Sequence, residues 1–220
     1  MNKIGKRLLK HYLLFFSLIT VSSIIFCVIW SKKDTITLIA DTSGYIALIF
    51  LSASLVTGTI KMSLNQINPI SSDFRRDLGI TGGVLAILHS ITGLFVHLRG
   101  HCWQYFLNKT AQAYSIRLDN FGLANYLGLI SALIILVLLL SSNNYSIKKL
   151  NPKNWKNLQR LSYVMFILAI IHCIFYRIIS SNFSLIYTLY LPLVSIVMLF
   201  QSYGVYLKFK ERRILITRGI

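Results

Sequence analysis

The sequence predicts an all-α integral membrane bundle of six transmembrane helices. Hydrophobic residues make up 55% of the 220 residues, only 13% are charged, and the mean hydropathy is +0.64. A helix needs about 20 mostly apolar residues to span a bilayer. The segments with suitable length and composition are His11–Trp30, Gly44–Ile60, Leu78–Leu98, Phe121–Leu140, Leu161–Ile179 and Phe183–Leu207. We therefore interpret residues 1–220 as a single transmembrane domain.

The first and last segments each carry a special feature. The basic residues before His11 would also suit a signal peptide, but Cys27–Lys32 lacks a small-x-small cleavage site, so a retained helix is favoured. Pro192 should kink the sixth segment.

The second segment, which begins at Gly44, is short, at 17 residues. The stretches 61–77, 99–120 and 141–160 are expected to be non-helical.

Basic residues are distributed unevenly about the predicted helices. The formal net charge is +17. With the N-terminus inside, 17 of the 23 basic residues are cytoplasmic: Lys3, Lys6, Arg7, Lys10, Lys61, Arg75, Arg76, Lys148, Lys149, Lys153, Lys156, Arg160, Lys208, Lys210, Arg212, Arg213 and Arg218. The outer six are Lys32, Lys33, Arg99, Lys109, Arg117 and Arg177. This asymmetry predicts a multi-pass protein of the bacterial inner membrane with both termini cytoplasmic. No basic and aromatic pattern indicates a nucleic-acid partner.

Two histidines lie deep in the predicted helices. His89 and His172 each follow the start of a segment, at Arg76 and Gln159, by 13 residues. If both helices cross in the same direction, the imidazoles lie at one depth, roughly 20 Å from the starting side. Ionisable groups at that depth are usually functional. Two neutral imidazoles on separate helices suit axial ligation of haem iron, which predicts a haem site between helices 3 and 5. The alternative for each histidine is a hydrogen bond to a neighbouring helix.

Other residues could line such a site. Gly82 and Gly93 lie on the His89 face, where small residues would admit a flat macrocycle, or simply let two helices pack closely. Arg177 and Arg99 lie outward of the two histidines and could bind haem propionates, or extend to lipid phosphate.

The remaining histidines are weaker candidates. His97 and His101, near the outer surface, could touch a propionate or replace His172 as a ligand. His11 is most simply interpreted as a residue at the cytoplasmic membrane interface.

Recognised motifs for other cofactors are missing from the sequence. No Cys-x-x-Cys-His attaches haem covalently, and Cys27, Cys102 and Cys173 carry no metal-ligand spacing. No glycine-rich nucleotide motif occurs. A flavin is left open, although no motif indicates one. Electrons would therefore arrive from a separate donor, a flavoprotein or a quinone, and would leave for an external acceptor.

Two segments resemble ferric-reductase-like transmembrane domains. Arg75-Arg76-Asp77-Leu78-Gly79 followed by Leu88-His89 is similar to their RRxLG…LH pattern. Ser141-Ser142-Asn143 and the segment 155–163 are similar to their TS…WxxLHRLxY pattern, with His172 after it. The resemblance covers about residues 44–179. It implies a six-helix bundle that binds haem b, most similar to the haem-binding membrane subunit of the bacterial methionine-sulfoxide reductase system.

The chain departs from this pattern at Gln159, where the family has histidine. A carboxamide is a poor iron ligand, so one haem at His89 and His172 is expected and a second, inner haem is not. Two functions stay open. One is an electron-transfer subunit of an oxidoreductase rather than a complete enzyme. The other is a redox-silent transporter or scaffold subunit that retains the fold.

Overall fold

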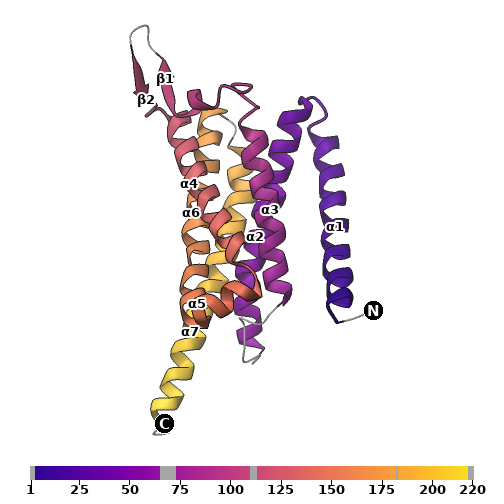
Figure 1. Ribbon diagram of the computed structural model, residues 1–220, viewed down its shortest axis with the longest axis vertical. Helices are drawn as coiled ribbons and strands as arrows, with labels where there is room; N and C mark the ends of the chain where they lie inside the picture. Colours follow the sequence, from indigo (N-terminus) through magenta and orange to yellow (C-terminus); the bar gives the residue numbers. More distant parts are fainter. Residues whose placement is uncertain (1–2, 65–72, 110–112, 182, 218–220) are drawn as a thin grey trace.

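The computed structural model describes residues 3–64, 73–109, 113–181 and 183–217 of the chain. Within these ranges the α-helices are α1 (Lys3–Ile29), α2 (Thr35–Ser63), α3 (Asp73–Gly93), α4 (Asn120–Ser141), α5 (Asn144–Gln159), α6 (Leu161–Ile179) and α7 (Leu191–Thr217). All except α5 run along the long axis of the molecule (Figure 1). The all-α membrane bundle predicted from the sequence is confirmed.

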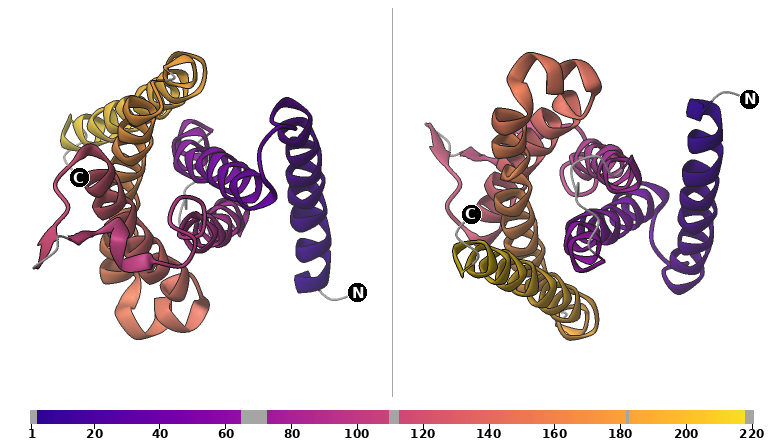
Figure 2. Two further views of the ribbon diagram at one scale, coloured as in Figure 1. Left: turned by 90° about the horizontal axis from the view of Figure 1, so that it is seen from above. Right: turned by 90° about the horizontal axis from the view of Figure 1, so that it is seen from below.

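Five stretches of the described chain are long and apolar enough to cross a membrane. They contain α1, α2, α4, α6 and α7. The helix α3 is not among them because it begins with Asp73, Arg75, Arg76 and Asp77. It nevertheless lies alongside α2 through the bundle (Figures 1 and 2). We therefore count α3 with the other five as a member of the six-helix bundle.

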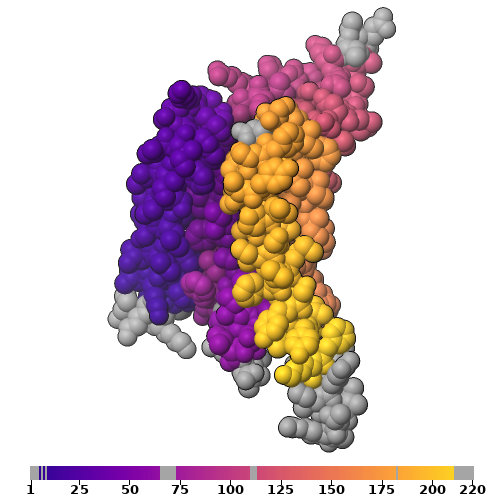
Figure 3. Space-filling view, turned by 180° about the vertical axis from the view of Figure 1, so that it is seen from behind, coloured from indigo at the N-terminus to yellow at the C-terminus, as the bar shows by residue number. Residues whose placement is uncertain are grey.

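The bundle contains two closely packed helix pairs, α2 with α3 and α4 with α6. Figure 2 shows α1 standing at one edge, where it contacts α2 and α3. One apolar core joins α2, α6 and α7, and Tyr45, Phe166 and Tyr190 are among its buried residues. A second core, centred on Phe15 and Phe50, joins α1 to α2 and α3. In Figure 3, α7 crosses the rear face and the end of α2 shows beside it.

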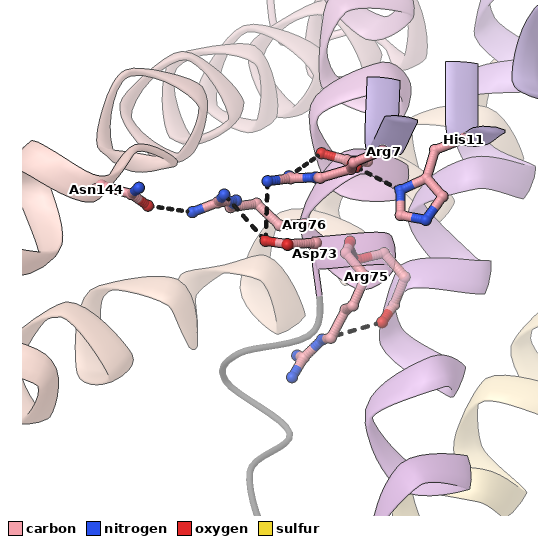
Figure 4. A network of polar contacts seen from close by, with 8 residues as sticks. Arg7, His11, Asp73, Arg75, Arg76 and Asn144 are labelled. Carbon is pink, nitrogen blue, oxygen red and sulfur yellow. Dashed lines mark hydrogen bonds and ion pairs between the residues drawn. The ribbon is translucent and has the colours of Figure 1, made fainter. Parts of the chain in front are cut away.

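A polar network ties α1 to α3 where both helices begin (Figure 4). The buried carboxylate of Asp77 accepts two bonds from the guanidinium of Arg7, at 2.6 and 3.1 Å. His11 Nδ1 lies 2.7 Å from the same carboxylate. Arg76 bonds Asp73 and the amide oxygen of Asn144 at the start of α5. The prediction that His11 is merely an interface residue is therefore wrong, because its ring turns inward to a buried acid.

Aspartates cap two helices at the other end of the bundle. Asp34 accepts bonds from the hydroxyl and backbone N–H of Thr37 at the start of α2, and these bonds hold the pKa of the Asp34 carboxyl below its usual range. Asp119 accepts from Gly122 N–H at the start of α4. Its bonds to Arg117, followed by this cap, lower the pKa of the Asp119 carboxyl. Each carboxylate satisfies N–H groups that a helix leaves unpaired in its first turn.

The structure corrects several predicted boundaries. The helix α2 begins at Thr35 rather than Gly44, because the Asp34 cap supports a turn of polar residues. The helix α3 ends at Gly93 rather than Leu98. The expected loop 99–120 contains a 3-10 turn, Cys102–Tyr105, and an antiparallel hairpin of β1 (Leu107–Lys109) and β2 (Tyr114–Ile116). Much of the expected loop 61–77 falls on residues 65–72, outside the described residues.

The expected loop 141–160 is mostly the polar helix α5. Asn143 caps its start, and Asn151, with φ of 58°, caps a second start at Pro152. Proline suits the first turn of a helix, where no N–H partner is needed. At Pro192, where the sequence predicts a kink, a π-helical turn, Ile186–Tyr190, lies immediately before α7. Proline cannot donate to the carbonyl four residues earlier, so the regular bonding pattern is interrupted there.

Candidate haem site

The two deep histidines face each other across the helix pairs. His89 comes from α3 and His172 from α6, and their ring centroids lie 6.1 Å apart, with an angle of 83° between the ring planes. The two rings therefore lie at one level in the bundle. This is the arrangement expected from the equal spacing of the two residues along parallel helices.

The separation of the two rings matches that of a shared metal. Two metal–nitrogen bonds of about 2.0 Å, plus roughly 1.1 Å from each nitrogen to its ring centre, would place the ring centres about 6.2 Å apart. The observed separation of 6.1 Å is close to this value. His89 and His172 could therefore hold one iron ion together, and haem would supply the remaining ligands.

Both imidazoles are held by backbone carbonyls of the neighbouring helices. His89 Nδ1 lies 2.8 Å from the carbonyl oxygen of Ala40 on α2, and His172 Nδ1 lies 2.7 Å from that of Ala124 on α4. A carbonyl oxygen can only accept, so each Nδ1 carries the proton and each Nε2 keeps its lone pair. Such a bond to the remote nitrogen orients a metal-binding imidazole and increases its basicity.

A glycine accompanies each of these carbonyls. A Cβ on Gly44 would lie 2.7 Å from Nδ1 of His89, and a Cβ on Gly128 would lie 2.7 Å from Nδ1 of His172. Each glycine follows the accepting alanine by four residues, as Ala40-x-x-x-Gly44 on α2 and Ala124-x-x-x-Gly128 on α4. The same local device therefore seats both histidines. Small residues at this spacing were not singled out from the sequence on these two helices.

The glycines predicted from the sequence lie elsewhere. A Cβ on Gly82 would meet Leu51 and Phe50 of α2 at 2.9–3.1 Å, so Gly82 allows α2 and α3 to pack closely. A Cβ on Gly93 would meet no described neighbour within 4 Å, and the carbonyl of Gly93 accepts a bond from the hydroxyl of Tyr105. The placement of Gly82 favours helix packing over a cofactor contact.

Arg177 lies outward of His172 on α6. One of its terminal nitrogens donates to the hydroxyl of Tyr45, the residue after Gly44. Its buried Nε has no hydrogen-bond partner among the described residues. A buried donor without a partner is costly, and a carboxylate would satisfy it. Arg99, the other predicted anchor, is exposed and lies close enough to Asp34 to lower the pKa of that carboxyl.

His97 lies in the loop after α3, not on the helix as predicted. Its ring stacks on that of Tyr176 at 5.8 Å, and Tyr176 contacts His172 with ring centroids 5.0 Å apart. Tyr176 also donates to Asn125 of α4. This aromatic contact connects the His172 ring to the outer loop. His101 is exposed, before the 3-10 turn.

The residues at the inner end of the helices provide no such pair. Gln159 donates to the hydroxyl of Ser141, and Trp155 donates from its indole to the Ser141 carbonyl at 2.8 Å. Arg76, at the equivalent level of α3, is bonded to Asp73 and Asn144. These contacts join the end of α4 to α5. Neither of these two positions offers an iron ligand. His11 of α1, the other histidine at this end, is bonded to Asp77 of α3.

The donors available also restrict the form of any bound iron. The part of the chain that the structure describes holds no group of three or more His, Cys, Asp or Glu side chains suited to a bare metal ion. Two imidazoles alone leave four iron positions to be filled by something else. A porphyrin has four nitrogens in one plane, so the opposed pair fits haem better than free iron.

A known family matches more than half of the chain. The family described as ferric reductase like transmembrane component matches residues 43–170, which include Gly44, His89 and the Ala124-x-x-x-Gly128 motif, while Ala40 and His172 lie just outside the matched range. The chain belongs to the ferric reductase-like transmembrane family. The family resemblance found in the sequence is therefore confirmed. No curated protein and no solved structure matches the chain. Membership of this family indicates electron transfer in a membrane.

Proposed function

We propose that this chain binds a single b-type haem between His89 and His172 and passes electrons across the membrane to an acceptor outside. The observation that carries the proposal is the 6.1 Å separation of two imidazoles whose Nδ1 atoms are already bonded to backbone carbonyls. When bound, haem supplies a one-electron iron couple whose potential depends on its axial ligands and on burial.

The protein's own groups would hold and tune that couple. Ala40 and Ala124 keep the Nδ1 protons in place, so both Nε2 lone pairs are available without loss of a proton. Arg177 offers a buried N–H for a propionate on the outer side. The apolar side chains around the pair would control the access of solvent to the iron and so its potential.

The proposed direction of transfer follows from the topology. The asymmetry of the basic residues supports a cytoplasmic location for both termini and an external one for the hairpin of β1 and β2. The donor would be a cytoplasmic flavoprotein or a membrane quinone, and the protein would be the membrane subunit of a reductase system in a bacterial inner membrane. Because the sequence resembles the membrane subunit of the methionine-sulfoxide reductase system, the reductase of that system is the first acceptor to test.

A redox-silent transporter or scaffold is the second candidate. The observation that favours it is Gln159, which bonds Ser141 where an inner ligand would stand. A protein that transfers electrons over the whole membrane through one haem must meet its donor deep in the bundle or accept a longer transfer distance. Retention of both His89 and His172, with their carbonyl partners, favours the electron-transfer function.

An absorption spectrum of the purified protein separates the two candidates. We expect a low-spin b-type spectrum that changes on dithionite reduction, and a haem-to-protein ratio near one. His89→Ala and His172→Ala should each abolish the low-spin signal because an axial bond is lost, while His101→Ala should retain it. A protein that folds with no haem, under ample haem supply, would overturn the proposal in favour of the redox-silent candidate. Loss of signal only in His101→Ala would move the site outward.

A further inference from the structure

A cavity of about 460 Å³ opens between the helices at the end that holds both termini. It is lined from α2, α3, α4, α5, α6 and α7. Its lining reaches Gly79 and Gly83 on α3, which precede His89 by ten and six residues, so the cavity lies on the inner side of the histidine pair. It is therefore separate from the proposed haem site.

The rim of the cavity is strongly basic. Its charged lining residues are Arg75, Arg76, Lys156, Arg160 and Lys208, and no acidic side chain of the described residues lines it. Arg160 bonds the side-chain amide of Asn157, which carries no charge. Of the six acidic residues in the chain, Asp34, Asp41 and Asp119 belong to the opposite end of the bundle. Glu211 on α7 belongs to this end, and Asp73 and Asp77 bind Arg7, with Asp73 also pairing with Arg76. The basic residues outnumber these three acids, so this end carries a large excess of positive charge.

The deeper lining is apolar. Leu51 and Leu55 come from α2, Ile135 and Leu138 from α4, and Met165 from α6. A site with cations at its mouth and aliphatic side chains below them suits an anion attached to an apolar group. A small inorganic ion alone would leave the apolar part in contact with water, which is unfavourable.

The residues between rim and floor do not suit haem. Gln159 and Arg76 stand at the level where iron ligands would be needed, and a carboxamide and a guanidinium are both poor ligands. Gln159 and Trp155 both donate hydrogen bonds to Ser141, and neither side chain is a good metal ligand. The cavity is thus chemically distinct from an iron site.

We propose that this cavity binds a phosphate-bearing amphiphile of net negative charge. Its phosphate would lie between Lys156 and Arg160, and its apolar part would lie on the leucines of α2 and α4. Guanidinium and ammonium groups form charge-assisted bonds to phosphate oxygens, which accounts for the basic rim. The phosphate has two sources at this membrane face, an anionic lipid headgroup or a soluble phosphate ester from the cytoplasm. The inference does not depend on haem binding.

The test compares two pairs of substitutions in α5 and at Arg160, the residue that follows it. Lys156→Gln with Arg160→Gln removes two rim charges, and Lys149→Gln with Lys153→Gln removes two exposed charges of α5 that do not line the cavity. Both pairs change the net charge equally. Purified protein in a neutral detergent is titrated with short-chain phosphatidylglycerol, with short-chain phosphatidylcholine and with riboflavin 5′-phosphate beside riboflavin. Thermal unfolding is followed by intrinsic fluorescence, which is read without reference to haem.

We expect phosphatidylglycerol or riboflavin 5′-phosphate to raise the unfolding temperature, and phosphatidylcholine and riboflavin to have little effect. The midpoint of that effect should shift about tenfold or more in the rim pair, because charge-assisted contacts are lost, and little in the control pair. A response to phosphatidylglycerol alone assigns the site to lipid, and a response to the flavin phosphate alone assigns it to a soluble ester. Equal responses to the charged and uncharged partners, or equal shifts in the two variant pairs, would overturn the proposal.

Discussion

Gly44 and Gly128 lie where the two deep imidazoles meet the neighbouring helices. Each glycine leaves space for a histidine ring whose Nδ1 donates to the carbonyl four residues earlier. A methyl group at either position would come within 2.7 Å of that nitrogen, which is far inside van der Waals contact. The ring and its hydrogen bond could not both stay in place.

Gly44→Ala and Gly128→Ala should therefore each reduce haem content and lower the unfolding temperature. Overpacking of this kind costs about 1–3 kcal/mol, which here would include the loss of one Nδ1 bond. Haem content per chain and thermal unfolding of the purified variants are the measurements. Gly93→Ala is the matched control, since no atom lies within 4 Å of its built Cβ. If Gly93→Ala were as damaging as the other two, steric contact with the histidines would not be the cause.

The sequence predicts that the two deep histidines lie at one level, but not the groups that orient them. Equal spacing from the helix starts placed His89 and His172 at one depth, and the structure brings their rings together. Gly44 and Gly128 were missed because periodicity does not reveal which face of one helix meets which residue of another. The repeated Ala-x-x-x-Gly on α2 and α4 was present as a signal. Its meaning required knowing that α2 pairs with α3, and α4 with α6.

The polar network of Arg7, His11, Asp73 and Asp77 joins α1 to α3 at the inner end of the bundle. Asp77 has a side chain only 2% exposed, and its carboxylate binds Arg7 and His11 of α1. Asp73 binds the same arginine, but its side chain is 52% exposed. The two acids therefore offer one buried and one hydrated contact to a single helix.

Asp77→Ala should loosen α1 by leaving Arg7 and His11 without their buried partner. Removing one member of a buried ion pair costs about 3–5 kcal/mol, whereas a solvent-exposed pair contributes about 0–1 kcal/mol. Thermal unfolding in detergent should show a clear fall for Asp77→Ala and a small one for Asp73→Ala. Haem content at low temperature should be unchanged in both, because neither residue contacts the histidine pair. Equal falls in the unfolding temperature would mean that the burial of Asp77 contributes little.

Helix boundaries were predicted less well than helix identities, for local reasons. Hydropathy finds apolar segments, so it missed the polar first turns of α2, which the Asp34 cap supports. It also missed α5, a polar helix with two asparagine caps that lies at the membrane end rather than through it. The hairpin of β1 and β2 is only three residues per strand, too short for an alternating pattern to emerge. Helix caps and short strand pairings depend on single residues, and a hydropathy averaged over many residues does not detect them.

At the scale of the whole molecule, charge and structure describe the same orientation. The chain ends and the basic rim of the inner cavity lie at one end, and the hairpin lies at the other (Figure 1). Asn108 in β1 and Ser181 in the turn after α6 belong to the hairpin end. Lys149 in α5 and Lys210 in α7 belong to the end with the basic residues. Loops rich in lysine and arginine usually stay on the cytoplasmic side of the membrane, so the basic end is expected to face the cytoplasm.

Reporter fusions at these four positions should therefore divide by end. Fusions at Asn108 and Ser181 should show external activity, and those at Lys149 and Lys210 should show cytoplasmic activity. If they do, the proposed direction of electron transfer follows, since the histidine pair would lie nearer the external face and the cationic cavity at the cytoplasmic face. Substituting Lys148, Lys149, Lys153 and Lys156 with glutamine should weaken the cytoplasmic signal at Lys210 if the α5 charges help to hold that end inside. An external signal at Lys149 in the unaltered protein would reverse the assignment, and the proposed acceptor would then be cytoplasmic.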